Sequence, residues 1–294
     1  MTDVLTREIS IAAATVPITE SSPGGGWRVL RTIGNILLRF VVSLVVVIGV
    51  WMLLLRIWDL EDYLIRGPVD VWNYLLDGAD SAARSKIATD LWITLKNAAV
   101  GLLAGTVAGV AVAILFNLFR PLEQGFTPVA LVLRSTPLVA MAPLISLVFG
   151  RGLAAVAVVG GIVTFFPTLV NVSLGLREVP QQTVDLLRAY GASRRMMMLK
   201  AQIPTALPAL FAALRAAAPL AITGALISEW LITGTGMGSS MNAARNTFEY
   251  DLMWTEVAIT TLGSLLIYSI TVGVEGAVLG RYAPDRARAA KTGA

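Results

Sequence analysis

The sequence predicts an all-α membrane protein with six transmembrane helices, and three observations support this prediction. Hydrophobic residues make up 56% of the 294, charged residues make up only 14%, and the mean hydropathy is +0.73. Apolar runs of about 20 residues, the length that a helix needs to cross a ~30 Å hydrocarbon core, recur along most of the chain. A soluble fold of this length cannot bury so much apolar surface, whereas lipid removes its hydration cost.

Six candidate spans account for these apolar runs. We place them at 36–57, 91–118, 127–149, 153–176, 209–231 and 255–280. The transmembrane domain therefore extends over 36–280. Polar residues and the breaker sequence Ser-Ser-Pro-Gly-Gly-Gly dominate 1–35, so this segment is predicted to be a flexible cytoplasmic tail. Residues 281–294 form a second cytoplasmic tail.

The third span is the least regular, because Arg134, Pro137 and Pro143 interrupt it. A broken helix in this place requires protein or a watery cavity to satisfy the freed backbone groups.

The second span carries Gly101, Gly105 and Gly109 at four-residue spacing. Such a stripe of small residues lets another helix approach closely, so we expect this span to lie inside a helix bundle. We expect Asn97 and Asn117, in the same span, to join helices by hydrogen bonds rather than to bind solute.

The distribution of Lys and Arg predicts the orientation. If the N-terminus is cytoplasmic, the inner segments carry most of these residues. The outer segments then hold Arg56, Arg66, Arg84, Lys86, Arg151 and Arg245. This bias follows the positive-inside rule and places both termini in the cytoplasm.

Several classes of function are excluded by what the sequence lacks. The chain has neither cysteine nor histidine, which removes thiolate chemistry and the usual zinc ligands. It has no P-loop run, so it cannot hydrolyse ATP by that mechanism alone. Gly234, Gly236 and Gly238 follow no strand and are predicted to form a turn before a short helix near 239–246. The net charge of +4 is dispersed between apolar spans, which membrane topology explains without nucleic acid. We expect a non-catalytic chain without a metal or cofactor of its own.

The loop 177–208, between the fourth and fifth spans, carries the functional signal. After Pro180 the spacing predicts a short helix that Gly191 ends with a left-handed cap. A second amphipathic helix, containing Arg194 and three methionines, is predicted to run to a stop at Pro204. Two short helices at a sharp turn can lie on anionic lipid headgroups or dock in the groove of a partner protein. Spacing alone leaves both interpretations open.

This loop resembles the signature of permease subunits of bacterial ABC importers, which runs Glu-Ala-Ala, three residues, Gly, nine residues, Ile, one residue, Leu-Pro. Asp185-Leu186-Leu187 occupies the Glu-Ala-Ala place, Gly191 the glycine, Ala201 the isoleucine, and Ile203-Pro204 the Leu-Pro. Asp for Glu keeps the charge, whereas two leucines replace the alanines and make the face more apolar.

The resemblance extends over about 55–280 and is closest to the nitrate, sulfonate and taurine branch. Supporting segments are Arg66-Gly67-Pro68, Val148-Phe149-Gly150, Ile227-Ser228-Glu229 and the glycine-rich run 234–238. The family implies a type I ABC importer permease fold in the bacterial inner membrane. It also implies a second permease subunit, identical or related, two ATPase subunits that bind ATP and Mg, and an extracytoplasmic solute-binding protein.

By this resemblance, 185–199 acts as a coupling helix that fits a cleft on the ATPase. The residues expected at this contact, or fixing its shape, are Asp185, Leu186, Leu187, Arg188, Tyr190, Gly191, Arg194 and Pro204.

Two charged residues inside spans are candidates for the translocation pathway. Glu229 must face protein or water, because exposure to lipid is costly; it either lines the path or braces the helices by pairing with Arg134 or Arg245. The guanidinium of Arg134 suits a sulfonate, nitrate or carboxylate, although pairing with a structural partner within the bundle is the alternative that the residue type favours. The transported solute is thus expected to be small and polar or anionic.

A secondary transporter or channel driven by an ion gradient is the alternative function. It would show titratable residues near the bilayer midplane and commonly two repeats. The spans carry few charges at their centres and no convincing repeat. A membrane-embedded enzyme is a third class, but the sequence offers no catalytic cluster at either interface.

Overall fold

The computed structural model describes residues 25–58 and 65–282, which are mostly helical and contain no strand. The chain divides into two compact units, 1–39 and 40–294. The described part of the first unit is the start of helix α2 (Gly25–Trp58). This helix therefore begins inside the segment that the sequence assigned to a flexible tail. The rest of both predicted tails, 1–24 and 283–294, lies outside the described residues.

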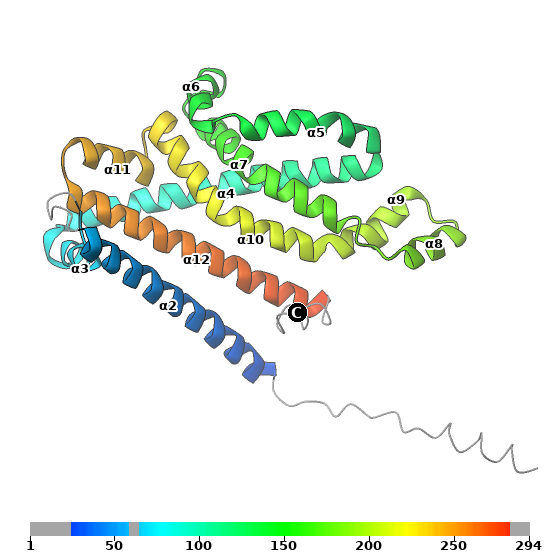
Figure 1. Cartoon of the computed structure of the whole chain (residues 1–294), viewed down its shortest axis with the longest axis horizontal. Coiled ribbons are helices and arrows are strands. Elements are labelled where there is room, and N and C mark those ends of the chain that lie inside the picture. Colours follow the sequence, from blue (N-terminus) through cyan, green and yellow to red (C-terminus); the bar gives the residue numbers. More distant parts are fainter. Residues whose placement is uncertain (1–24, 59–64, 283–294) are drawn as a thin grey trace, which may run out of the picture. The chain divides into compact units, whose positions relative to one another are not determined.

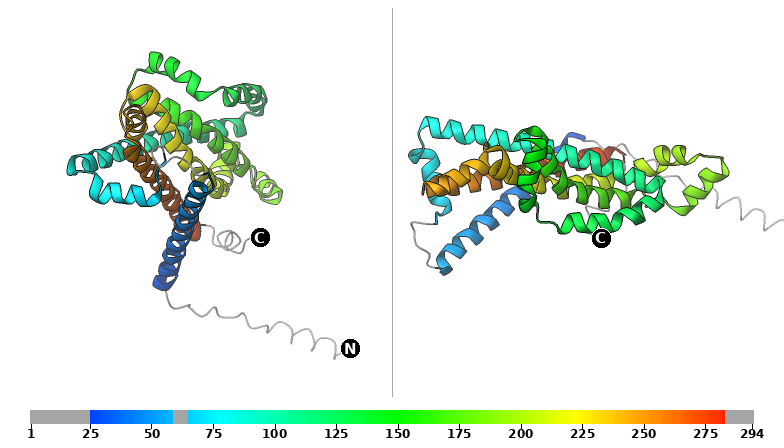
Figure 2. Two further views of the ribbon diagram at one scale, coloured as in Figure 1. Left: turned by 60° about the vertical axis from the view of Figure 1, so that its left-hand side comes forward. Right: turned by 90° about the horizontal axis from the view of Figure 1, so that it is seen from above.

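The second unit continues with helices joined by short turns. In chain order they are α3 (Pro68–Asn73), η1 (Tyr74–Gly78), α4 (Ser81–Leu118), α5 (Arg120–Ser135), α6 (Leu138–Phe149), α7 (Leu153–Gly175), α8 (Gln181–Ala189), α9 (Arg194–Met197), η2 (Met198–Gln202), α10 (Ile203–Ser228), η3 (Glu229–Thr233), α11 (Met237–Asn246) and α12 (Tyr250–Tyr282). Within this unit, α8 and α9 lie at the end opposite to α3 and α11 (Figures 1 and 2).

Four helices of the described chain are long and apolar enough to cross a membrane. They are α4, α7, the continuous run Arg194–Thr233 and the part of α12 from Tyr250 to Leu279. Val41–Ile57 in α2 and Leu138–Phe149 form shorter apolar helices. Each of the six overlaps one of the predicted spans, although their bounds differ. Helix α4 begins earlier than the predicted 91, because Asp80 caps it by accepting a hydrogen bond from the Ala83 amide at 2.7 Å.

The third predicted span, 127–149, is two helices, α5 and α6, that separate at Thr136 and Pro137. Proline cannot donate a backbone hydrogen bond, and it pushes the residue before it out of the helical region. The hydroxyl groups of Ser135 and Thr136 both donate to the Val132 carbonyl at 2.9 Å and close the end of α5. The predicted break therefore occurs at Pro137, whereas Pro143 is accommodated within α6.

The centre of the second unit is formed by α4, α7 and α10, which approach one another at glycine residues. A Cβ atom added to Gly101 would lie 2.7 Å from the Cα of Gly160, and one added to Gly224 would lie 2.9 Å from the same atom. The Thr164 hydroxyl bridges two of these helices, because it lies 2.8 Å from the Gly160 carbonyl and 3.0 Å from the Gly101 carbonyl. The close packing expected from the glycine stripe is confirmed.

The sequence predicted that the helix containing Arg194 stops at Pro204, and this prediction is wrong. Helix α9 passes through η2, a π-helical turn, directly into α10, with Pro204 at the start of that helix. A proline ring normally clashes with the carbonyl four residues earlier and leaves it unbonded. The wider π turn at 198–202 changes the local bonding pattern, so the helix continues across the proline.

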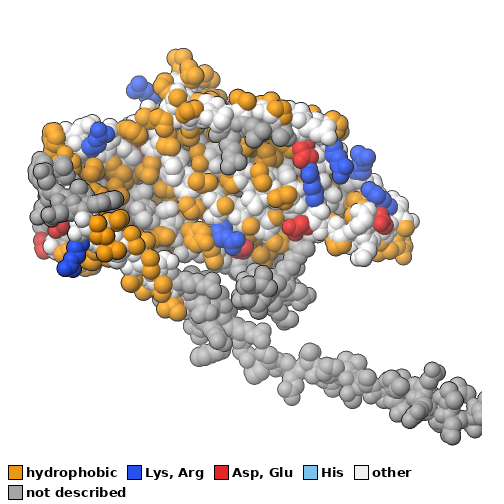
Figure 3. Space-filling model, viewed as in Figure 1, with side chains coloured by type: hydrophobic (Ala, Val, Ile, Leu, Met, Phe, Trp, Pro, Cys, Tyr) orange, Lys and Arg blue, Asp and Glu red, His pale blue; other side chains and the backbone are white. Residues whose placement is uncertain are grey.

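Apolar side chains cover much of the visible surface (Figure 3), and charged side chains gather mainly near α8 and α9 and on the side of α3. Exposed aliphatic side chains include Val45 on α2, Leu103 on α4 and Leu147 on α6. Helix α2 contacts the rest of its unit through Trp51, which stacks on Trp254 of α12 with ring centroids 5.7 Å apart. Such a surface suits lipid and contacts between helices in a membrane.

Candidate functional site

The turn after α8 has a conformation that Gly191 makes accessible. Its φ angle is +73°, in the left-handed region. The Gly191 amide donates to the Arg188 carbonyl and the Ala192 amide to the Leu187 carbonyl, both at 2.9 Å. These two bonds form a Schellman motif, so the predicted glycine cap is confirmed. Ser193 then caps α9 by accepting a hydrogen bond from the Met196 amide at 3.2 Å.

The helices α8 and α9 present apolar and charged side chains to their surroundings. Leu186 is 58% exposed and Tyr190 is 83% exposed, whereas Leu187 is half-buried. Asp185 accepts a hydrogen bond from the Gln181 amide group at 3.0 Å and lies 3.9 Å from Arg188. Exposed large apolar groups on a charged helix are typical of a surface that another molecule covers.

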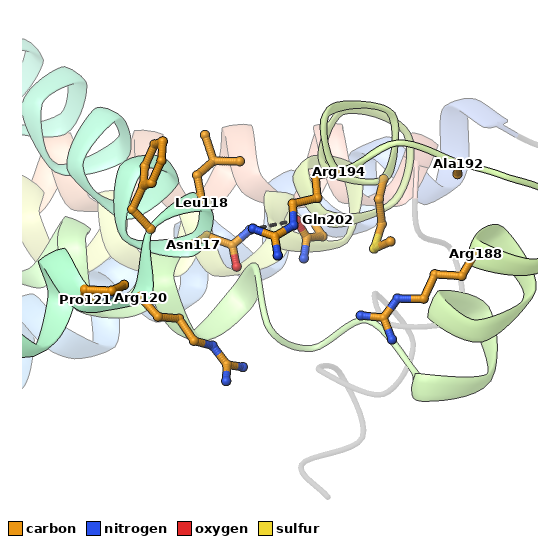
Figure 4. Close-up of a pocket in the computed structure, with 10 residues that line it drawn as sticks. Asn117, Leu118, Arg120, Pro121, Arg188, Ala192, Arg194 and Gln202 are labelled. Carbon is orange, nitrogen blue, oxygen red and sulfur yellow. Dashed lines mark hydrogen bonds between the residues drawn. The ribbon is translucent and has the colours of Figure 1, made fainter.

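An open cleft of about 770 Å³ lies between the junction of α4 with α5 and the junction of α8 with α9. Arg120, Arg188 and Arg194 reach it from three different helices (Figure 4). Asn117 donates a hydrogen bond to Gln202 at 2.7 Å and ties the end of α4 to η2. The helix-joining role predicted for Asn117 is therefore confirmed. The sequence missed the cleft, because no pattern showed that 117–121 meets the loop after α8.

At the other end of the unit, Glu229 lies 0% exposed among hydrogen-bond donors. The Thr94 hydroxyl and the Asn97 amide of α4 each donate to its carboxylate at 2.8 Å, and the Gly238 amide donates at 3.0 Å. The Met237 amide in turn donates to the Thr94 hydroxyl at 2.9 Å. The carboxylate therefore joins α4, η3 and the start of α11.

The glycines predicted to form a turn before α11 allow this arrangement. Gly234 and Gly236 have φ angles of +72° and +84°. A Cβ atom on Gly236 would lie 2.5 Å from the carboxylate carbon of Glu229, and one on Gly238 would lie 3.1 Å from its Cβ. The glycine-rich run thus lets the backbone wrap around a buried acid. The predicted turn and short helix are confirmed.

Among the described residues, Glu229 contacts Thr94, Asn97 and Gly238, and no ion pair with Arg245 is among these contacts. The Arg134 side chain lies outside the described part of the structure. Its backbone belongs to α5. Many kinds of hydrogen-bond donor can satisfy a carboxylate, so the sequence alone could not identify Thr94 as a partner of Glu229. The one indication was that Thr94 lies one helical turn before Asn97.

Two further carboxylates sit in the bundle. Glu275 of α12 pairs with Arg215 of α10 at 2.6 Å. Glu256 is 0% exposed; its polar neighbours are Ser240 and Lys86, but neither reaches hydrogen-bond geometry with its carboxylate.

Residues 101–279 match the family model of the binding-protein-dependent transport system inner membrane component. The chain is 30% identical over 227 residues to a probable ABC transporter permease protein of Haemophilus influenzae, covering 76% of this chain and 89% of the relative. It is 26% identical over 235 residues to the formylaminopyrimidine transport permease protein ThiX of Halalkalibacterium halodurans, covering 78% and 92%. It is also 26% identical over 250 residues to the nitrate import permease protein NrtB of Leptolyngbya laminosa, covering 83% and 87%.

A solved inward-facing structure of the MetNI methionine ABC transporter superposes with a TM-score of 0.60 at 20% identity, covering 68% of this chain and 99% of that chain. This likeness confirms the predicted fold. The nitrate permease among the relatives agrees with the branch that the sequence indicated. The chain therefore belongs to the family of binding-protein-dependent transport system inner membrane components, as a transmembrane permease subunit of an ABC importer.

Proposed function

We propose that residues 185–199, which contain the second half of α8, α9 and the start of η2, transmit the movement of a separate ATPase to the transmembrane helices. The permease would act with two ATPase subunits that bind ATP and Mg, a second permease subunit and an extracytoplasmic solute-binding protein. Membership of the family supports this set of partners. The exposure of Leu186 and Tyr190 on a charged helix is the observation that supports docking at this place.

The caps around Gly191 support the proposal because they hold the docking surface in one shape. A Schellman motif ends α8 and a serine cap starts α9, so the angle between the two helices is set by backbone bonds. A surface that is ordered before binding loses less entropy when a partner docks.

The continuity of the helix beyond α9 provides a route for the movement. Arg194–Thr233 forms one run of 40 residues, about 60 Å at 1.5 Å per residue. Helix α10 meets α7 at Gly224 and Gly160, backbone against backbone, which leaves little room for sliding. A displacement of α9 would therefore move α4, α7 and α10 together and reach the turn that Glu229 holds.

The transported solute is proposed to be small and polar or anionic. The relatives named for nitrate and for formylaminopyrimidine carry different solutes, and both permeases cover most of this chain. Arg134 remains the candidate for contact with an anion. The buried contacts of Glu229 support a structural role in this conformation.

We also propose that both termini and the α8–α9 end face the cytoplasm of a bacterium, with α3 and α11 on the outer side of the inner membrane. The excess of Lys and Arg in the segments that the sequence predicts to be cytoplasmic supports this orientation. In this proposal the ATPase subunits hydrolyse ATP, and this chain binds them and moves its transmembrane helices.

The test compares carboxylates introduced at the two ends of the bundle. Leu186→Asp and Tyr190→Asp should weaken binding of the co-encoded ATPase at least about tenfold, or about 1.4 kcal/mol, because the new charge would be buried in the contact. Asn246→Asp, at the exposed last position of α11, is the control and should leave binding unchanged. Normal ATPase binding and solute uptake by both α8 variants would show that coupling does not run through this helix.

A further inference from the structure

The cleft between the α4–α5 junction and the α8–α9 junction has a strong excess of positive charge. The ten residues that line it include three arginines and no aspartate or glutamate (Figure 4). Among the described residues, Arg120 and Arg194 have no carboxylate partner, and Arg188 has only an exposed one at 3.9 Å. The acid on the next turn of α5, Glu123, is paired with Arg177.

Three guanidinium groups that line one cleft give it a positive potential, which attracts anions. Guanidinium groups bind phosphate through two parallel N–H bonds, which gives the pair both strength and direction. The nearby amides of Asn117 and Gln202 add polar groups to the floor of the cleft. The charge and the donors together fit a phosphate monoanion better than a neutral solute.

The other half of the lining is apolar and continues a membrane-spanning helix. Leu118 ends α4, and Phe119 beside it is 55% exposed. Pro121 and Met197 complete the apolar wall. A cationic cleft directly beyond an apolar helix end places phosphate contacts next to acyl-chain contacts, as a phospholipid at the membrane interface requires.

We propose that this cleft binds the headgroup phosphate of an anionic phospholipid, which links the start of α5 to α8 and α9. This goes beyond the proposed coupling function and does not depend on it, because the site needs only the membrane and the three arginines. A bound lipid would hold α8 and α9 against the α4–α5 junction until a partner or a movement opens the cleft.

The experiment measures lipid binding to the full chain in nanodiscs that contain equal amounts of phosphatidylglycerol and phosphatidylcholine, by native mass spectrometry after release. The wild type should retain phosphatidylglycerol in preference to phosphatidylcholine. Arg120→Gln and Arg194→Gln should each lower that preference about fivefold, the equivalent of about 1 kcal/mol for one basic residue at an anionic surface. Arg195→Gln, next to the cleft but outside its lining, should keep it.

Thermal unfolding of each variant establishes that it is folded before its lipids are compared. Equal losses in Arg195→Gln and Arg194→Gln would mean diffuse attraction to the surface and would overturn the proposal. So would the absence of any preference in the wild type. Inorganic phosphate that displaces phosphatidylglycerol completely would show recognition of the free anion instead.

A separate arm measures ATPase binding in lipid-free detergent. If Arg120→Gln and Arg194→Gln lose ATPase affinity there while the wild type shows no lipid preference, the cleft takes an acidic protein segment and the lipid proposal is wrong. If lipid preference falls in these variants while ATPase affinity stays normal, the lipid site is supported. The coupling proposal is then tested separately by Leu186→Asp and Tyr190→Asp.

Discussion

Replacing Glu229 by alanine is expected to destabilise the protein strongly, because three buried donors converge on its carboxylate. The Thr94 hydroxyl, the Asn97 amide and the Gly238 amide lie 2.8, 2.8 and 3.0 Å from its oxygens. A buried donor without an acceptor costs about 1–3 kcal/mol. Allowing for coupling among neighbours, we expect a loss of about 3 kcal/mol or more.

Glu229→Gln provides a graded comparison. Its oxygen can take the place that Thr94 and Gly238 share, and its amide group then faces Asn97. The Asn97 amide can turn by 180° to present its own oxygen, so the three contacts are kept, with the one to Asn97 reversed in direction. Only the charge on the acceptor is lost, and we expect about 1–2 kcal/mol.

Thermal unfolding of the purified permease measures both losses. At about 2–4 °C for each kcal/mol in a chain of this size, Glu229→Ala should unfold at least about 6 °C below the wild type, with Glu229→Gln between the two. Uptake should fall in parallel with stability. An alanine variant that unfolds at the wild-type temperature but transports nothing would refute the bracing role and place Glu229 in the solute pathway.

Three further predictions concern packing, charge and the turn. Gly101→Ala should destabilise the protein by about 1–3 kcal/mol more than Gly276→Ala, because the first Cβ meets the Gly160 backbone at 2.7 Å and the second meets no atom within 4 Å. Equal shifts of the unfolding temperature in the two variants would contradict close packing. Arg215→Gln should destabilise by about 1 kcal/mol or more by leaving Glu275 without its partner, and adding Glu275→Gln should restore most of the loss in the same melting assay. Gly191→Ala should add about 1–2 kcal/mol of local strain at φ +73° and reduce ATPase-coupled uptake, whereas unchanged uptake would show that the turn geometry is unimportant.

The sequence predicted the spans and the main turn because these depend on local chemistry. Apolar runs report transfer into lipid residue by residue, and Gly191 follows an amphipathic helix at the position where a left-handed residue is needed. The glycine stripe at 101–109 likewise marks a face that another helix can approach. Each of these features can be recognised from residues that lie close together in the sequence.

Features that depend on residues far apart in sequence were not predictable in the same way. Pro204 looked like a helix stop because proline normally breaks the local bonding pattern, but a π turn at 198–202 accommodates it. Two of the three partners of Glu229, Thr94 and Asn97, lie on α4, more than 130 positions away. Helix propensity and hydropathy say nothing about which span supplies the donors.

The two buried acids near the α11 end show why position alone does not define function. Glu229 and Glu256 are both 0% exposed, yet one receives three hydrogen bonds and the other reaches none in the described structure. A fully satisfied acid resists rearrangement, because any movement must break several buried bonds at once. An acid without such bonds opposes movement far less. Glu229 therefore ties the start of α11 to α4, whereas α12 has no such buried bonds at Glu256 in the described part of the chain and has less to lose by moving.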